Sequence, residues 1–207
     1  PHSRTKVPNY ALKIEPANHF LNWQQDPHGN WLARVVFPDP VDHFRIQVDL
    51  LADLDIINPF DFFVEPYAET YPFAYDPEEA FDLQRTMQRH YPDPDDEVGK
   101  WARRFTRIGQ PTETGHLLMT LCNAIHESFT YARRSVHGTQ APLETLALRR
   151  GTCRDFALLM MEAVRSLGLA ARFVTGYIYV PDRDGSITHG GGSTHAWCQV
   201  YLPGAGW

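Results

Sequence analysis

Hydrophobic and polar positions alternate with a period of two through the first part of the chain. Apolar side chains recur at every second position in three segments, residues 10–14, 31–37 and 44–50. This period is typical of half-buried β-strands. Residues 26–30 (Asp-Pro-His-Gly-Asn) favour a tight turn, so residues 20–37 are predicted to form a hairpin. We therefore predict a small β-rich N-terminal domain over residues 1–65.

Residues 58–75 are rich in aromatic side chains and proline, and their apolar positions follow neither the strand period of two nor the spacing of a helix. We interpret this segment as an irregular linker that packs against the domains on both sides. A surface that binds a partner is the alternative interpretation of the same composition.

From residue 77 onward the apolar positions recur with the spacing of helices. Helices are predicted over residues 77–90, 98–108, 117–129, 142–149 and 152–167. The last has the widest apolar stripe, with Thr152 placed to cap its start and Gly168 suited to the left-handed position that ends a helix. A strand at 170–180, a Gly/Asp-rich loop at 181–193 and a strand at 194–202 are predicted to follow. The second domain, residues 66–207, is therefore predicted to be α+β, with a central helix against an antiparallel sheet.

Composition excludes several classes of function. The chain has 207 residues and a formal net charge of −6, and its arginines are scattered, so nucleic acid is not an expected partner. No run approaches the roughly 20 apolar residues of a membrane helix, and no membrane partner is expected. Three cysteines without a Cys-x-x-Cys pair argue against a disulfide framework or a structural zinc site. A reduced, cytoplasmic protein without a cofactor is the expectation.

Cys153 stands where a loop enters the predicted central helix. A thiol in the first turn faces unpaired backbone N–H groups and the positive end of the helix dipole, which favour the thiolate. The same N–H groups can receive a developing oxyanion. Gly151 is expected to leave room for a substrate backbone. Asp155, one turn along, is interpreted as the capping-box partner of Thr152.

His195 is the second candidate, at the start of the last predicted strand. Strand alternation puts His195 and Trp197 on one face and Ala196 and Cys198 on the other. A helix packed on a sheet can bring a thiol and an imidazole together although they are far apart in sequence. His195 could then protonate the amine that leaves when a thiolate attacks an amide.

The other cysteines and histidines are assigned no catalytic role. Cys122 and Cys198 are predicted to lie in the core, and His189 is expected to be solvated. His116, His126 and His137 lack the spacing of a metal site. A metal hydrolase that uses His189, His195 and Cys153 is the least favoured alternative.

Three segments together resemble a known family. They are Gly151-Thr152-Cys153-Arg154-Asp155-Phe156-Ala157, the stretch from Gly168 to Tyr177, and Thr194-His195-Ala196-Trp197-Cys198-Gln199-Val200-Tyr201-Leu202. They resemble the transglutaminase-like core of bacterial cysteine-protease relatives, which has a papain-like fold, and Phe129-Thr130-Tyr131 matches an aromatic pair of that core. Residues 1–65 resemble the β-rich region often fused to it.

The resemblance implies a catalytic triad. Its nucleophile falls on Cys153 and its imidazole on His195, while the backbone N–H of Cys153 would help to form the oxyanion hole. The third member is implied to be an Asp a little beyond Gly206-Trp207. We therefore expect this chain to stop short of that residue, and to be weakly active or inactive, because the acid orients the imidazole.

The sequence leaves the reaction open between related chemistries. The favoured hypothesis is a cysteine peptidase or amidase acting on a peptide or protein amide, with water resolving the thioester. Protein-glutamine transamidation, in which an amine resolves it, is the alternative. A non-catalytic binding module that retains the fold is the hypothesis from another class.

Overall fold

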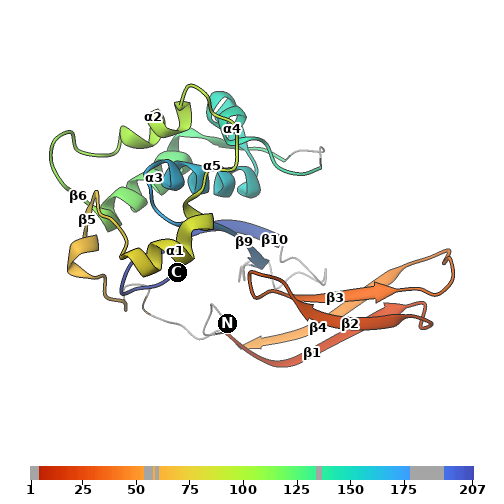
Figure 1. Ribbon diagram of the computed structural model, residues 1–207. Coiled ribbons are helices and arrows are strands. Elements are labelled where there is room, and N and C mark those ends of the chain that lie inside the picture. Colours follow the sequence, from red (N-terminus) through yellow and green to blue (C-terminus); the bar gives the residue numbers. More distant parts are fainter. Residues whose placement is uncertain (1–4, 54–57, 59–60, 134–136, 178–193) are drawn as a thin grey trace. The chain divides into compact units, whose positions relative to one another are not determined.

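The computed structural model describes residues 5–53, 58, 61–133, 137–177 and 194–207. Its chain divides into two compact units, Pro1–Pro59 and Phe60–Trp207 (Figure 1). The predicted domains were residues 1–65 and 66–207. In the described part of the chain, no helix combines the length and apolar character needed to cross a bilayer.

The N-terminal unit consists of two antiparallel ribbons. Strand β1 (Lys6–Glu15) pairs with β4 (Arg45–Asp53), and β2 (Phe20–Gln25) pairs with β3 (Trp31–Val36). The hairpin prediction is confirmed. In its turn Asp26 Oδ1 accepts hydrogen bonds from the N–H groups of His28 and Asn30, both at 2.8 Å. The Tyr10 and Trp23 rings, 6.3 Å apart, connect the two ribbons.

The C-terminal unit contains the predicted helices and sheet. The helices are α1 (Pro77–Met87), α2 (Glu97–Arg103), α3 (Thr114–Ser128), α4 (Pro142–Leu148) and α5 (Cys153–Ser166), and a short 3-10 helix spans Pro66–Ala68. The strands are β5 (Thr70–Tyr71), β6 (Thr112–Glu113), β7 (Thr130–Tyr131), β8 (Arg150–Gly151), β9 (Ala171–Tyr177) and β10 (Thr194–Val200). Helix α2 ends five residues before the predicted end at 108.

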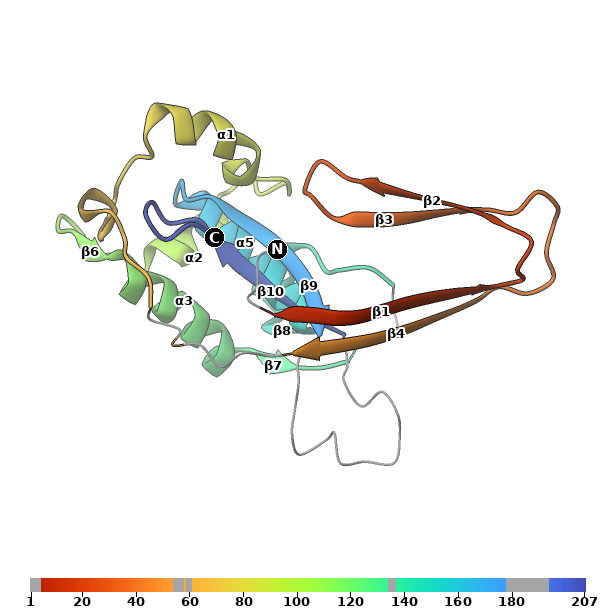
Figure 2. The same cartoon turned by 90° about the horizontal axis from the view of Figure 1, so that it is seen from below.

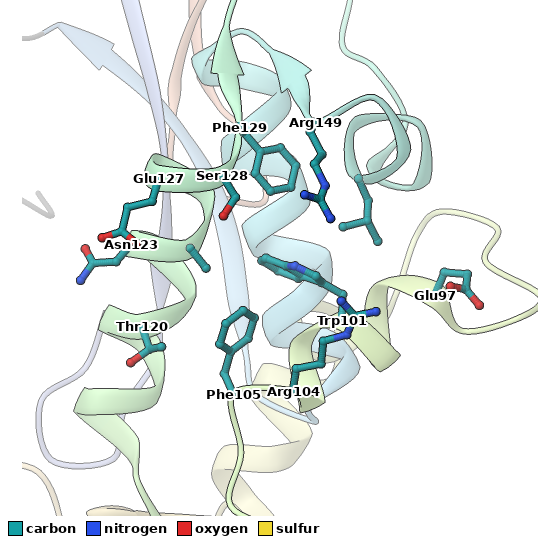
Figure 3. Close-up of a pocket in the computed structure, with 12 residues that line it drawn as sticks. Glu97, Trp101, Arg104, Phe105, Thr120, Asn123, Glu127, Ser128, Phe129 and Arg149 are labelled. Atoms are coloured by element: carbon teal, nitrogen blue, oxygen red, sulfur yellow. The ribbon is translucent and has the colours of Figure 1, made fainter.

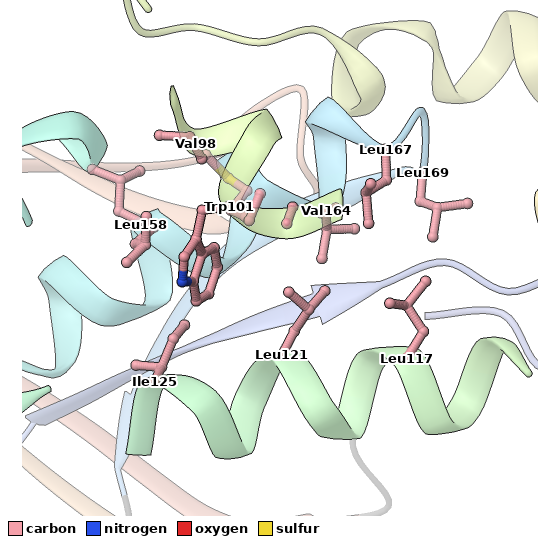
Figure 4. Packing of buried hydrophobic residues seen from close by; sticks show 14 of the residues in the cluster. Val98, Trp101, Leu117, Leu121, Ile125, Leu158, Val164, Leu167 and Leu169 are labelled. Atoms are coloured by element: carbon pink, nitrogen blue, oxygen red, sulfur yellow. The ribbon is translucent and has the colours of Figure 1, made fainter. Parts of the chain in front are cut away.

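Helix α5 is the centre of this unit. It contacts all four other α-helices as well as β8, β9 and β10. In Figure 1 the β9–β10 ribbon lies below α5, while α2 and α4 lie above it, and Figure 2 shows the same arrangement from below. Figure 4 shows Leu117, Leu121 and Ile125 of α3 facing Trp101 of α2 and Val164 of α5. These side chains are buried, so the helix that begins at Cys153 is fixed along its length.

An ion-pair network fixes the start of α2. Asp93 accepts hydrogen bonds from Arg89 Nη2 at 2.6 Å and from the N–H groups of Glu97 and Val98 at 2.8 and 3.0 Å. Arg89 also reaches Asp96, which in turn binds Arg103. Burial alone would raise the pKa of Asp93, but the Arg89 hydrogen bond and the two backbone N–H donors outweigh it and lower that pKa.

This lowered pKa predicts acid sensitivity. A carboxylate whose pKa is depressed by folding stabilises the protein above its unfolded pKa of about 3.9, and this stabilisation is lost as the pH falls through the folded pKa. Asp93→Asn should lower the free energy of unfolding by about 1–2 kcal/mol at pH 7, because a helix cap is lost. Urea titrations at pH 7 and pH 3 should show a smaller loss at acid pH. Asp95→Asn, at an exposed neighbour, is the control, and equal losses for both variants would contradict the prediction.

Candidate active site

A parallel bridge positions the chain that leads to Cys153. Strand β7 pairs with β8, so that Tyr131 lies opposite Gly151. The N–H of Thr130 donates to the carbonyl of Arg149 and the N–H of Ala132 to that of Gly151, both at 2.8 Å. The segment after α3, which includes the aromatic Phe129 and Tyr131, therefore runs beside the residues that precede the thiol.

Asp155 holds the first turn of α5 from inside. It is fully buried. Its Oδ2 accepts from the N–H and the hydroxyl of Thr152, both at 2.8 Å, and its Oδ1 accepts from the N–H of Gln140 at 2.7 Å. The capping box with Thr152 as N-cap is present, which confirms that interpretation. One carboxylate thus ties the helix start to the loop before α4.

Gly151 packs closely against the first turn of α5. A Cβ at Gly151 would lie 2.9 Å from Asp155 Cβ and 3.3 Å from Phe156 Cε1. The residue is buried, and its missing side chain admits the first turn of α5. The structure thus gives Gly151 a packing role, and the approach of a substrate backbone to it stays a prediction.

Cys153 is the first residue of α5 and is partly exposed. This is the position at which we expect the N–H groups of the first turn and the helix dipole to act on the thiol, and that effect stays a prediction. The thiol residue is thus partly exposed, while most of the helix behind it is buried. The backbone geometry is suited to a nucleophile that needs anion stabilisation.

His195 lies at the same end of the C-terminal unit as Cys153, because helix α5 and strand β9 have nearly equal lengths. Helix α5 has 14 residues and spans about 21 Å, while β9 has 7 residues and spans about 23 Å. The short connection through Gly168 (φ +81°) reverses the chain, so β9 runs back along α5. Its last residues therefore lie level with the start of the helix. Gly176 is paired with His195 of β10.

Burial confirms the predicted faces of β10. Ala196 is 5% exposed, and Cys198 packs against the hydrophobic core. His195 is half-buried on the opposite face, and Trp197 on the same face is 37% exposed. Both active-site candidates thus stand on packed elements at one end of the unit, and the direct contact between thiol and imidazole stays a prediction.

The three cysteines have different surroundings. Burial raises the pKa of the Cys198 thiol to about 12, which confirms its core assignment. Cys122, however, is exposed, so its core assignment is wrong. On α3 the buried positions are Leu117, Leu121 and Ile125, and Cys122 lies about 100° around the helix from Leu121.

The metal alternative falls mainly outside the described residues. His189 and the predicted loop at 181–193 belong to the undescribed part of the chain. Among the residues that the structure describes, no three histidine, cysteine or acidic side chains are grouped closely enough to hold a metal ion.

A pocket of about 630 Å³ is lined by residues of α2, α3 and α4 and of the segments that follow these helices. Figure 3 shows Trp101, Phe105 and Phe129 along it, with Arg104 and Arg149 at its edges. Phe129 also contacts Phe156 of α5, with ring centroids 5.9 Å apart. Sequence reasoning missed this pocket because its lining comes from several helices. The aromatic pair at positions 101 and 105 was the available signal.

Comparisons with known proteins cover both units. Residues 99–207 match the transglutaminase-like superfamily, and residues 1–53 match the bacterial transglutaminase-like N-terminal region. An uncharacterized protein of Mycobacterium tuberculosis is 27% identical over 207 residues, which cover 97% of this chain and 64% of that protein. An uncharacterized protein of Mycobacterium leprae is 40% identical over 63 residues, which cover 30% of this chain and 22% of that protein.

A solved structure has a similar fold. The crystal structure of a proposed cysteine protease from Cytophaga hutchinsonii superposes with a TM-score of 0.68 at 19% identity, covering 99% of this chain and 64% of that one. The chain thus spans 64% of the length of this structure and of the Mycobacterium tuberculosis relative.

Proposed function

Because the chain belongs to the transglutaminase-like superfamily, whose papain-like, thiol-enzyme fold it shares, we propose that its thiol site serves acyl transfer on amide bonds. The weak activity or inactivity expected of this chain itself stays a prediction. Cys153 is the nucleophile and His195 its acid–base partner. The observation that carries the proposal is the position of Cys153 at the start of a buried helix, level with His195. The presence of both Cys153 and His195 speaks against the hypothesis of a non-catalytic module.

The proposed reaction has two half-reactions. The Cys153 thiolate attacks the amide carbonyl carbon, and the oxyanion that forms is met by the N–H of Cys153. Protonated His195 gives its proton to the leaving amine, the C–N bond breaks, and a thioester remains. In the second half-reaction His195 takes a proton from water, the resulting hydroxide attacks the thioester, and the acid and the thiolate are released.

We propose hydrolysis of a peptide or protein amide as the overall reaction, in a cytoplasmic setting. Transamidation differs only in that an amine resolves the thioester, so it remains the second form of the same proposal. The third triad member, an Asp beyond Trp207, stays a prediction.

The three cysteines provide an internal test of the proposal. Iodoacetamide labelling followed by peptide mass spectrometry should modify Cys153 about ten- to a hundredfold faster than exposed Cys122 at pH 6. Cys198 should stay unlabelled while the protein is folded, since burial keeps it protonated to a pH of about 12.

The His195→Ala variant decides whether the thiolate is paired. It should reduce the labelling of Cys153 at pH 6 to the rate of Cys122, and His126→Ala, at an exposed histidine of α3, should leave it unchanged. If Cys153 reacts no faster than Cys122 in the unmodified protein, the non-catalytic module becomes the better description.

A further inference from the structure

Trp197 on β10 leaves no space for a side chain at position 176 of the neighbouring strand β9. A Cβ built on Gly176 would lie 2.6 Å from Cη2 and 3.1 Å from Cζ3 of Trp197. Contacts this short do not occur in folded proteins, so the indole occupies the space where a side chain of residue 176 would stand. Trp197 itself pairs with Val174, and its ring therefore reaches diagonally across β9.

The same contact places the indole beside His195. Gly176 and His195 are directly paired across the ribbon, and paired residues of an antiparallel ribbon point to the same face with Cβ atoms about 4.5–5.5 Å apart. The indole edge that fills the Gly176 position therefore faces the imidazole from the β9 side. Trp197 is also two positions along the strand from His195, on the same face.

We propose that Trp197, held across Gly176, is a positioning residue for His195: the indole fills the space over β9 into which the imidazole would otherwise rotate. This inference rests on the proposed function for its consequence, but its geometry stands apart from catalysis. Gly176 is then needed for the reaction although it touches neither substrate nor thiol.

The physical effect is a restriction of rotamers. A histidine at the end of a strand has several staggered side-chain conformations, and here the conformations that lean toward β9 are blocked. The indole is 37% exposed, so the part of it that does not lie over Gly176 stays open to solvent. An imidazole held in one orientation delivers its proton to one point, as an acid–base catalyst requires.

Substitutions at the two positions should not be additive. Gly176→Ala adds a methyl group that displaces the indole, and Trp197→Ala removes the indole. In the double variant the methyl group meets no ring, so Gly176→Ala should add nothing to Trp197→Ala. Gly115→Ala is the control, since a Cβ there has no neighbour within 4 Å. Trp197→Phe serves as a milder second variant if Trp197→Ala fails to fold.

Two measurements on the full chain test the inference. In NMR spectra with labelled histidine, the His195 ring protons should show the ring-current shift of a neighbouring indole and should lose it in Gly176→Ala and Trp197→Ala. Iodoacetamide labelling of Cys153 at pH 6 should slow by about ten- to a hundredfold in both single variants. The double variant should equal Trp197→Ala in both measurements.

The outcomes separate this inference from the proposed function. If His195→Ala leaves Cys153 labelling unchanged, the proposed function fails, and the NMR shift still decides whether Trp197 positions the imidazole. The positioning role is overturned if the chemical shifts of the His195 ring protons are the same in all variants. It is also overturned if the effects of Gly176→Ala and Trp197→Ala are additive in the double variant, whatever the labelling shows.

Discussion

Replacing Asp155 with alanine is expected to lower the free energy of unfolding by about 3–5 kcal/mol. The carboxylate is fully buried and accepts hydrogen bonds from the N–H of Gln140 and from the N–H and hydroxyl of Thr152. Without it these buried donors lose an acceptor, and each unsatisfied group costs about 1–3 kcal/mol. The total is a large part of the roughly 5–15 kcal/mol that stabilises a typical domain.

The isosteric change Asp155→Asn should be milder. Its amide keeps one oxygen, which can still accept from Thr152, but its NH₂ group faces a backbone donor at Gln140 or Thr152. We expect a loss of about 1–3 kcal/mol. Urea denaturation of both variants, with Asp82→Asn on the exposed side of α1 as the control, measures these differences. A loss below about 1 kcal/mol for Asp155→Ala would show that water replaces the carboxylate.

The same substitution should affect the thiol. Asp155 fixes the N-cap residue that precedes Cys153, and it ties that residue to the loop before α4. When this turn loosens, the N–H groups that favour the thiolate are no longer held in place. The labelling advantage of Cys153 over Cys122 at pH 6 should therefore shrink in Asp155→Asn even where the protein remains folded.

Much of the fold could be predicted because local patterns agree with it. The strand period at residues 10–14, the turn at 26–30 and the long apolar stripe of α5 each identify an element that the structure contains. Thr152 and Gly168 mark the start and end of α5 correctly, because capping depends on residues close in sequence.

The remaining differences come from tertiary context. Ile108 was placed in the second helix, but it is fully exposed, and α2 stops at Arg103. Cys122 was assigned to the core because it falls on the apolar stripe predicted for this helix, yet the buried positions of α3 are Thr114, Leu117, Leu121 and Ile125. The Gly176–Trp197 contact joins two strands through their register, which a single sequence does not reveal.

In the candidate site, too, some features could be predicted from local sequence and others depend on tertiary structure. Cys153 and His195 could be proposed from motifs, and their position at one end of the unit follows from the lengths of α5 and β9. The groups that hold them could be predicted only in part. Asp155 was recognised as a capping residue, but its hydrogen bond to Gln140 depends on how the preceding loop folds back.

The other end of α5 is held by a second buried charge, and its loss should be as costly. Glu162 is fully buried, accepts from the N–H of His90 at 3.3 Å and lies 3.4 Å from Arg165 Nη1. Glu162→Ala should lower the free energy of unfolding by about 3–5 kcal/mol, because removing one partner of a buried pair leaves the other uncompensated. Arg89 adds to this cost, since its Nε lies 3.8 Å from Glu162 and makes no hydrogen bond within the described residues.

The contacts of Arg165 explain why Glu162→Ala should weaken the packing of neighbouring elements as well as of α5. Its guanidinium donates to the carbonyl of Ala171 at 3.1 and 2.8 Å and to that of Gln88 at 2.9 Å. It therefore ties α5 to the first residue of β9 and to the end of α1. Burial lowers the pKa of Arg165, and the Glu162 charge opposes that shift, so removing Glu162 leaves a buried cation without its counter-charge.

A double-mutant cycle measures the interaction energy between Glu162 and Arg165 apart from their contacts with other residues. Arg165→Met removes the cation but keeps an apolar side chain, and in combination with Glu162→Ala it should cost less than the sum of the single losses, by about 0.5–3 kcal/mol. Glu127→Ala, an exposed glutamate of α3, should change the free energy of unfolding by less than about 0.5 kcal/mol. If Glu162→Ala costs no more than that control, or if the single losses add, the two charges do not act as a pair. A coupled loss would instead show that a buried charge pair holds the far end of α5, where Arg165 also binds the first residue of β9.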